Sequence, residues 1–557
     1  MSKKLLIIAG SLVLVLGAAA GVGAYFLIQV QSLSHPPEQT ARYLPAETSL
    51  YASMNLSPGA GQLLKARDIL DLFKENPRFE EQLDELYEDF EEETGIDLEE
   101  DLFPWLGPEI AVAIPTFEGI EENPEVVAFI GHTDKAAAES FLRKLMASGE
   151  EAGEIDYEER VTRGHLTFVV DPSAEVSAYI ALADHYVVVA AAAGTLESTL
   201  DRMDGGPARP SLFDDPGFQE AREAAESPRF GLMYVDVAGI VDQAGEVVAE
   251  DITDGLQDFT DQLPDFIVAS SSFIEGGILV STSFDYPVSD QLFVPVAGNS
   301  LGSAGLAPED TVALLSFVGV QDGWERFRDE VADLPDLDLD EAVEEIEAEI
   351  GIDIEQDVIG WMTGEMAFAL LLPAGASFSA EEIHANAYVG FSDRDEALSG
   401  MTRIQGALED GGIEFRGVDI EGVDAVVMEL DDEPGPAGLT PGYVVLDDYV
   451  VVGTTLTSLR QAAEAERGDV PSLRESSAFS RPLEAVGGST DFVAFANIRR
   501  IVQEALDQVD ETELAEYRET AEPFVAPLET FLLGVAVEEG LVTISAVITF
   551  AGPAAER

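Results

Sequence analysis

The stretch GIDLEEDLFPWLGPEIAVAI, residues 95–114, decides how this chain folds, because a second version of it, GIDIEQDVIGWMTGEMAFAL, occupies residues 351–370. Trp105 and Trp361 stand at the same place in the two versions, and the chain has only three tryptophans. A repeat of this length, with matched glycine, aspartate, tryptophan and glutamate positions, predicts two tandem copies of one folding unit.

Most of this repeated block has a structural interpretation. Gly95 and Gly351 end acidic amphipathic segments and fit the left-handed position that comes after a helix. Asp97 and Asp353 fit the N-cap of a new short helix, with a Glu or Gln three residues further on as in a capping box. The block therefore predicts a helix stop and, directly after it, a helix start.

The tryptophans complete the apolar face of that short helix. Trp105 comes after Leu98 and Leu102 at the i, i+4, i+7 spacing of one helix face, and Trp361 has apolar residues at the same spacing before it. This face is expected to pack into a core.

Glu109 and Glu365 are the part of the block that this interpretation does not explain. Each stands at the entrance to an apolar, strand-like run. We expect them to accept backbone N–H bonds, and binding of a ligand is the alternative.

Matches on both sides of the block define the domain organisation. We expect an α+β unit over residues 44–284 and a homologous one over 306–551, joined by a Pro-, Gly- and Ser-rich linker at 285–305 and ending in a tail at 552–557. Strands joined by hairpins and separated by acidic amphipathic helices predict α+β units with mainly antiparallel sheets.

The N-terminus predicts a membrane anchor. Lys3 and Lys4 precede an apolar run at residues 5–30, which is long enough to cross a bilayer. Residues 1–30 are thus expected to form a cytoplasmic tip and transmembrane helix, and residues 31–43 a stalk. The positive-inside rule then places the bulk of the chain outside the cytoplasm, as a single-pass protein of the cell membrane. A cleaved signal peptide is the alternative.

Gly17 and Gly21 form a GxxxG pair within that run. Such pairs let two membrane helices approach closely, which would support a weak homodimer.

The composition restricts the partners. The formal net charge is −79, from 29 Lys and Arg against 108 Asp and Glu, so binding to nucleic acid is excluded as a function. A salt-rich medium would screen this charge, and loose collection of divalent cations is the competing interpretation. The chain has no cysteine, which excludes disulfides and thiolate metal sites.

Three stretches beyond the apolar run support a family resemblance: LPAETSLYASMNL at 44–56, EEETGIDLEEDLFPWLGPEIA at 91–111 and YIALADHYVVVA at 179–190. With them the chain resembles a bacterial family known as "domain of unknown function 3352". The resemblance implies a membrane-anchored, extracytoplasmic α+β protein. It carries over no catalytic or ligand-binding residues.

The sequence contains no convincing catalytic motif. Residues 298–302 match G-x-S-x-G, but the segment SAGLAPED at 303–310 is not the helix start that a nucleophile elbow needs, so a flexible linker is the better interpretation. The five histidines are scattered and form no metal-binding pair: His35, His132, His165, His185 and His384. We therefore predict no catalytic residue, no cofactor and no metal.

The sequence is compatible with three functions. A non-enzymatic interaction or scaffold protein of the cell envelope, with an unknown envelope partner, is favoured by the repeat and by the lack of catalytic motifs. A carrier or sensor of an apolar ligand held in a cleft is the alternative, supported by runs such as VVVAAAA at 187–193. A hydrolase with an unrecognised carboxylate site is the third.

Overall fold

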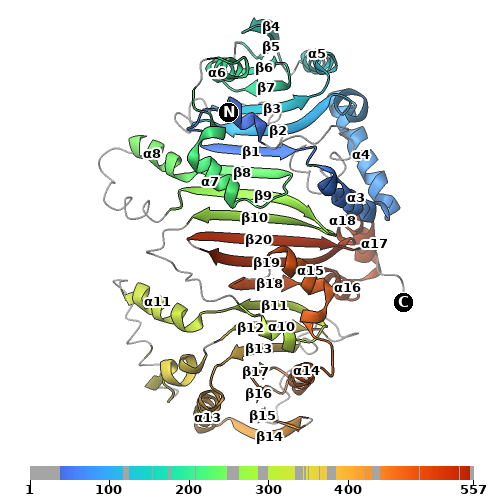
Figure 1. Ribbon diagram of the computed structural model, residues 1–557. Coiled ribbons are helices and arrows are strands. Elements are labelled where there is room, and N and C mark those ends of the chain that lie inside the picture. The colour runs from blue at the N-terminus through green and yellow to red at the C-terminus, as the bar shows by residue number, and fades with distance from the viewer. Residues whose placement is uncertain are drawn as a thin grey trace. The chain divides into compact units, whose positions relative to one another are not determined.

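The computed structural model describes most of the chain after residue 37. The described residues are 38–116, 125–153, 155–173, 177–206, 209–247, 263–285, 299–332, 343, 347–348, 351–362, 364–372, 384–420, 422–429, 439–487, 490–538 and 540–551. Within them the 20 strands belong to one antiparallel sheet, with helices packed on it (Figure 1).

This single sheet corrects the predicted fold class, an N-terminal transmembrane helix followed by two homologous α+β units with mainly antiparallel sheets and acidic amphipathic helices. The chain does divide into two compact units, one of residues 1–288, 540–543 and 550–557 and one of residues 289–539 and 544–549. Strand β20 (Leu541–Phe550) contributes residues to both units. Hydrophobic periodicity within a strand does not reveal such pairing between distant strands.

The predicted transmembrane helix has no counterpart in the part of the chain that the structure describes. No described helix combines the length and the apolar character needed to cross a bilayer. Residues 5–30, with Gly17 and Gly21, lie outside the described residues.

Unit 1 has the strand order β4-β5-β6-β7-β3-β2-β1-β8-β9-β10. Its elements are η2 (Gln39–Tyr43), β1 (Leu50–Asn55), α3 (Ala60–Lys74), α4 (Pro77–Thr94), η3 (Leu98–Leu102), β2 (Leu106–Ile114), β3 (Val127–His132), α5 (Lys135–Glu151), β4 (Tyr157–Thr162), β5 (His165–Val170), β6 (Ala178–Leu182), β7 (Tyr186–Ala190), α6 (Ala193–Met203), η4 (Leu212–Asp214), α7 (Pro216–Ala224), β8 (Gly231–Asp236), α8 (Val237–Val247), β9 (Phe266–Ile274) and β10 (Gly277–Asp285).

Unit 2 has the corresponding order β14-β15-β16-β17-β13-β12-β11-β18-β19. Its elements are α10 (Gly302–Leu306), β11 (Thr311–Phe317), α11 (Val320–Ala332), η6 (Ile354–Val358), η7 (Ile359–Trp361), β12 (Met366–Leu371), β13 (His384–Gly390), α13 (Arg394–Asp410), β14 (Glu414–Ile420), β15 (Val423–Glu429), β16 (Gly442–Val445), β17 (Tyr449–Gly453), α14 (Leu456–Arg467), η8 (Leu473–Glu475), α15 (Ser477–Ala485), β18 (Phe492–Ala496), α16 (Ile498–Leu506), α17 (Glu511–Thr520), α18 (Glu522–Val525) and β19 (Leu528–Glu538).

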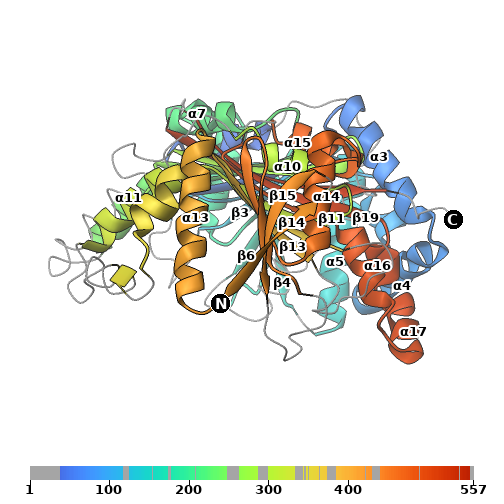
Figure 2. The ribbon, with the colours of Figure 1, turned by 90° about the horizontal axis from the view of Figure 1, so that it is seen from below.

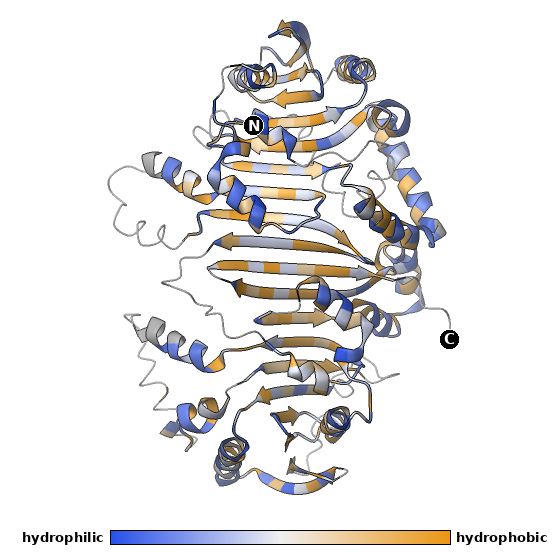
Figure 3. Cartoon of the chain, viewed as in Figure 1, coloured by the Kyte–Doolittle hydropathy of each residue, from blue (hydrophilic) through white to orange (hydrophobic). Residues whose placement is uncertain are grey.

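The cores lie between the sheet and the helices. In unit 1, η2, α6, η4 and α7 cover one face of the central strands, while α5 and Trp105 cover the opposite face of β3 and β5–β7. In unit 2, α13 and α14 lie on opposite sides of strands β13–β17 (Figure 2). Apolar residues concentrate in the strands and hydrophilic residues on the helices (Figure 3).

Among the described residues, one face of the middle strands of unit 2 carries exposed apolar side chains. Leu315, Phe368, Leu370 and Val452 project from it and are 37–45 % exposed. The residues paired with Leu315 and Phe368 across the ladder, among them Ala387, are also apolar. Such pairs share one face of a sheet, so the exposed side chains form a continuous apolar surface, which we call the open face.

Candidate functional site

Glu109, at the start of strand β2, is buried in unit 1 with 1 % of its surface exposed. Its Oε1 accepts hydrogen bonds from the backbone N–H (3.3 Å) and the hydroxyl (2.8 Å) of Thr40 and from the hydroxyl of Tyr51 (3.3 Å). Its Oε2 accepts from the hydroxyl of Tyr186 at 3.1 Å. Both carboxylate oxygens are thus held by donors from three separate elements, η2, β1 and β7.

Glu365 holds the matching position in unit 2, with 4 % of its surface exposed. The backbone N–H of Ser303 donates to its Oε2 at 3.1 Å, and the Ser303 hydroxyl donates to its Oε1. The hydroxyls of Ser316 (2.5 Å, to Oε1) and Tyr449 (2.8 Å, to Oε2) complete the set.

The two arrangements correspond donor by donor. A backbone N–H and a hydroxyl come from one residue of a short helix, Thr40 in η2 and Ser303 in α10. A tyrosine at the start of a strand, Tyr186 or Tyr449, supplies a further donor. Only the remaining hydroxyl differs in kind, since unit 1 uses a tyrosine and unit 2 uses Ser316.

Two glycines in unit 2 leave room for this packing. A Cβ on Gly302 would lie 2.1 Å from the Tyr449 hydroxyl oxygen, so Gly302 allows this tyrosine to reach Glu365. A Cβ on Gly390 would lie 3.0 Å from the backbone nitrogen of Glu365. Glycine at these places lets helix α10 lie close to Tyr449 and strand β13 lie close to the backbone of Glu365.

Burial governs the electrostatics of the site. Desolvation raises the pKa of Glu109, and the hydrogen bonds from Thr40, Tyr186 and Tyr51 act against this shift. Burial, with the nearby Glu109 charge, also raises the pKa values of Tyr51 and Tyr186, and burial beside Glu365 does the same for Tyr449. The tyrosines therefore stay protonated and act as donors.

This geometry suits an anchor. Each carboxylate is enclosed, and its hydrogen bonds fix a short helix (η2 or α10) to the sheet. A general acid or base must instead be within reach of a substrate proton.

The other residues of the repeated block lie at a helix stop and a helix start. Gly95 and Gly351 adopt left-handed φ values of 71° and 74°. The Asp97 carboxylate accepts from the backbone N–H groups of Glu99 and Glu100, and the Asp353 carboxylate from that of Gln356.

The hydrogen bond donated by the N-cap backbone N–H differs from the one expected in a capping box. The backbone N–H of Asp97 donates to Asp101, and that of Asp353 to Asp357, so the partner stands four residues on instead of three. The short helix is a single π-helical turn, whose wider spacing accounts for the change.

Trp105 and Trp361 are 1 % and 4 % exposed, and each indole N–H donates to the backbone carbonyl four residues earlier.

The residues that contact the glutamates were not predicted from the sequence. Thr40 falls in the predicted stalk and Ser303 in the predicted linker, yet both belong to helices that pack on the sheet. The linker interpretation of Asn299–Gly302 was therefore wrong in its described part, and Gly298 lies outside the described residues. The stretch YIALADHYVVVA at 179–190 and its counterpart YVVLDDYVVVG at 443–453 were a usable signal, because the second tyrosine of each, Tyr186 or Tyr449, donates a hydrogen bond to the glutamate of its unit.

Three of the histidines make local contacts or lie in buried surroundings. His132 Nε2 is 3.0 Å from the carbonyl of Ala183, and His165 Nε2 is 3.0 Å from a carboxylate oxygen of Asp204. Burial lowers the pKa of His384. Across the described ranges, no group of three or more histidine and carboxylate side chains is arranged to hold a metal ion. His35 lies outside these ranges.

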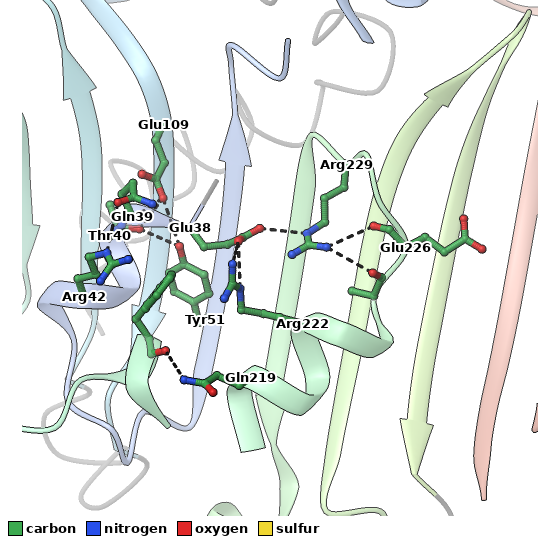
Figure 4. A network of polar contacts seen from close by, with 12 residues as sticks. Glu38, Gln39, Thr40, Arg42, Tyr51, Glu109, Gln219, Arg222, Glu226 and Arg229 are labelled. Atoms are coloured by element: carbon green, nitrogen blue, oxygen red, sulfur yellow. Dashed lines mark hydrogen bonds and ion pairs between the residues drawn. The ribbon is translucent and has the colours of Figure 1, made fainter. Parts of the chain in front are cut away.

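A second polar network adjoins Glu109 in unit 1 (Figure 4). Glu38, 2 % exposed, lies between two arginines. Arg222 donates from Nε (3.1 Å) and Nη2 (3.0 Å) to its Oε2, and Arg229 donates from Nε to its Oε1 at 3.0 Å.

The comparisons with known proteins place the chain in a family without assigning it a task. No curated protein matches it. Solved structures with some likeness include two crystal forms of TP0453, at 10 % identity over 47 % of this chain and 82 % of that one (TM-score 0.25) and at 12 % over 45 % and 81 % (TM-score 0.24). These scores are too low to carry an argument. The family model described as "Protein of unknown function (DUF3352)" matches residues 7–539, and the chain belongs to that family.

Proposed function

We propose that this protein is a non-enzymatic interaction protein of the cell envelope, built from two tandem copies of one unit, which binds a partner protein through the open face of unit 2. The observation that carries the proposal is the exposure of Leu315, Phe368, Leu370 and Val452 on neighbouring strands. Continuous apolar patches on the surfaces of soluble proteins commonly mark interaction sites.

The charge distribution supports this surface as a binding site. The chain has 108 Asp and Glu residues, yet strands β11, β12, β17 and β18 contain no charged residue at all. The rings of Phe317 and Phe368 also lie side by side there, with centroids 6.5 Å apart. Aromatic residues with few charges around them are typical of the buried centre of a protein interface.

The matching positions in unit 1 are smaller or more deeply buried. By strand register, Ala52 corresponds to Leu315 and Val112 to Phe368, and both unit 1 residues are only partly exposed. The exposed apolar surface is therefore particular to unit 2 and is not a general property of the fold, which supports binding at unit 2.

The location in the envelope rests on the sequence. Lys3 and Lys4 before the apolar residues 5–30 support a place outside the cytoplasm for the rest of the chain.

Co-purification with substituted chains tests the proposal. We expect full-length protein to bring down a discrete envelope protein, and Phe368→Glu with Leu370→Glu to abolish this, because both substitutions bury charge in the interface. Val161→Glu is the matched control, since Val161 is 74 % exposed on strand β4 of unit 1. Equal recovery of the partner by the double variant and the control would refute the proposal.

An apolar ligand is the second candidate, because the open face offers the same apolar contacts to a lipid-like molecule. Native mass spectrometry of protein extracted from membranes distinguishes the two. A bound mass of a few hundred daltons, lost in the Phe368→Glu and Leu370→Glu variant, would favour the ligand.

A further inference from the structure

Unit 2 serves as an internal control for the Glu38 network, because it has no charges at the corresponding places. The strand and helix registers match Glu38 with Leu301, Arg222 with Leu483 and Arg229 with Thr490. Glu38 and Leu301 even share the left-handed backbone conformation, with φ of 56° and 50°.

The fold therefore does not require these three charges. Leu301 is 3 % and Thr490 2 % exposed, so unit 2 packs uncharged residues where unit 1 buries ions. Replacing a buried ion cluster by apolar residues is often neutral or stabilising, since desolvating the charges offsets their attraction. The three charged side chains in unit 1 therefore need an explanation other than stabilisation of the fold.

A pocket opens beside these charges. It has a volume of about 240 Å³ and is lined by Gln219, Arg222, Glu223 and Arg229. At about 30 Å³ for each water, it has room for about eight waters, which is enough for a small ion or metabolite.

The arginines retain donors for a ligand. Among the described residues, the Glu38 carboxylate accepts hydrogen bonds from Nε and Nη2 of Arg222 and from Nε of Arg229. Nη1 of Arg229 donates to the backbone carbonyls of Ala225 and Glu226. Nη1 of Arg222 and Nη2 of Arg229 have no such partner within that part of the chain.

A third arginine strengthens the positive character of the region. The guanidinium carbons of Arg42 and Arg222 lie 3.6 and 4.7 Å from the centroid of the Phe213 ring. Three arginines in one small region are unusual for a chain that has only 29 Lys and Arg among 557 residues.

We infer that this pocket is a binding site for a small oxyanion, a molecule that presents a phosphate or carboxylate group to Arg222 and Arg229. Glu38 fixes the two guanidiniums in place, and guanidinium forks are suited to bidentate contact with such groups. Exposed Glu223 at the rim weakens the binding by repulsion. The inference is independent of the function proposed for the open face.

Calorimetric titration of the full-length protein at low ionic strength tests the inference, with inorganic phosphate and succinate as probes. We expect at least one probe to bind wild type at one site per chain. Glu223→Gln should tighten this binding about threefold or more, because it removes a like charge near the anion. Glu484→Gln, at the corresponding place in unit 2, is the matched control and should leave it unchanged.

A unit-2-like variant completes the test. Glu38→Leu, Arg222→Leu and Arg229→Thr together should weaken binding at least tenfold while the protein still unfolds cooperatively. Absence of binding of both probes to wild type would overturn the inference, and so would unchanged affinity in the Glu223→Gln variant or in the folded triple variant. The Glu223→Gln arm changes an exposed side chain, so it decides the matter even if the triple variant does not fold.

Discussion

The hydroxyl of Tyr186 donates a hydrogen bond to Oε2 of Glu109 across 3.1 Å, joining the start of strand β7 to the start of strand β2 within unit 1. Tyr449 and Glu365 repeat this contact at 2.8 Å in unit 2. The contact closes the ring of donors that anchors a short helix to the sheet, and it can be removed by deleting a single oxygen atom.

We predict that Tyr186→Phe and Tyr449→Phe each lower the free energy of unfolding by about 1–3 kcal/mol, because each leaves a buried carboxylate short of one donor. Tyr179→Phe, on strand β6 beside β7, is the control, and we expect a change within about 0.5 kcal/mol. Guanidinium unfolding curves measure all three. Equal effects at positions 179 and 186 would contradict the anchoring role.

We predict a pH-dependent difference between wild type and Glu109→Gln. Desolvation raises the folded pKa of Glu109 above its unfolded value, which lies near 4.3. The folded state then holds the proton more tightly, so this stabilising contribution is complete below about pH 4.3 and is lost as the pH rises through the folded pKa. Wild type should therefore lose stability relative to the variant as the pH rises above about 4.3. A flat difference for Glu109→Gln would be inconsistent with the raised pKa.

We predict that Gly302→Ala destabilises unit 2 by an amount similar to Tyr449→Phe, because the added Cβ would lie 2.1 Å from the tyrosine oxygen. The two substitutions together should cost less than the sum of their separate effects, since they disturb one contact. Gly305→Ala, on the same helix with nothing within 4 Å of its Cβ, should be neutral or stabilising by up to about 1 kcal/mol. If the effects of Gly302→Ala and Tyr449→Phe on the free energy of unfolding were additive, Gly302 would not act through its contact with Tyr449.

We predict that thermal stability rises with salt. A net charge of −79 repels itself, and the Debye length shortens from about 10 Å at 0.1 M to about 3 Å at 1 M. Melting temperatures in sodium chloride from 0.1 to 2 M measure the effect. A melting temperature that stays constant or falls would disprove the interpretation of the acidic surface as an adaptation to a salt-rich medium.

The sequence predicted local features better than connections between distant ones. Repetition of the block around Trp105 and Trp361 indicated matched units, and the hairpin patterns indicated antiparallel strands. The single sheet was missed because the residues of β20 give no sign of which strands they pair with.

The donors around the glutamates were missed for a related reason. Thr40 lies 69 positions from Glu109, in a polar segment close to two prolines that has the composition of a linker. Its hydroxyl acquires a role only when the fold brings η2 onto the sheet. The Glu38 network was likewise invisible, because its arginines come 184 and 191 positions later.

Site-specific photo-crosslinking tests the central claim, that the open face of unit 2 is the binding surface, most directly. A benzophenone amino acid placed at Phe368 in the full-length protein should form one discrete adduct in cells, and one placed at Val161 in unit 1 should not. The claim predicts that the Phe368 adduct disappears when Leu315→Glu is added on the neighbouring strand. Adducts of the same mass from both positions, or an adduct from Phe368 that persists in the Leu315→Glu background, would contradict it.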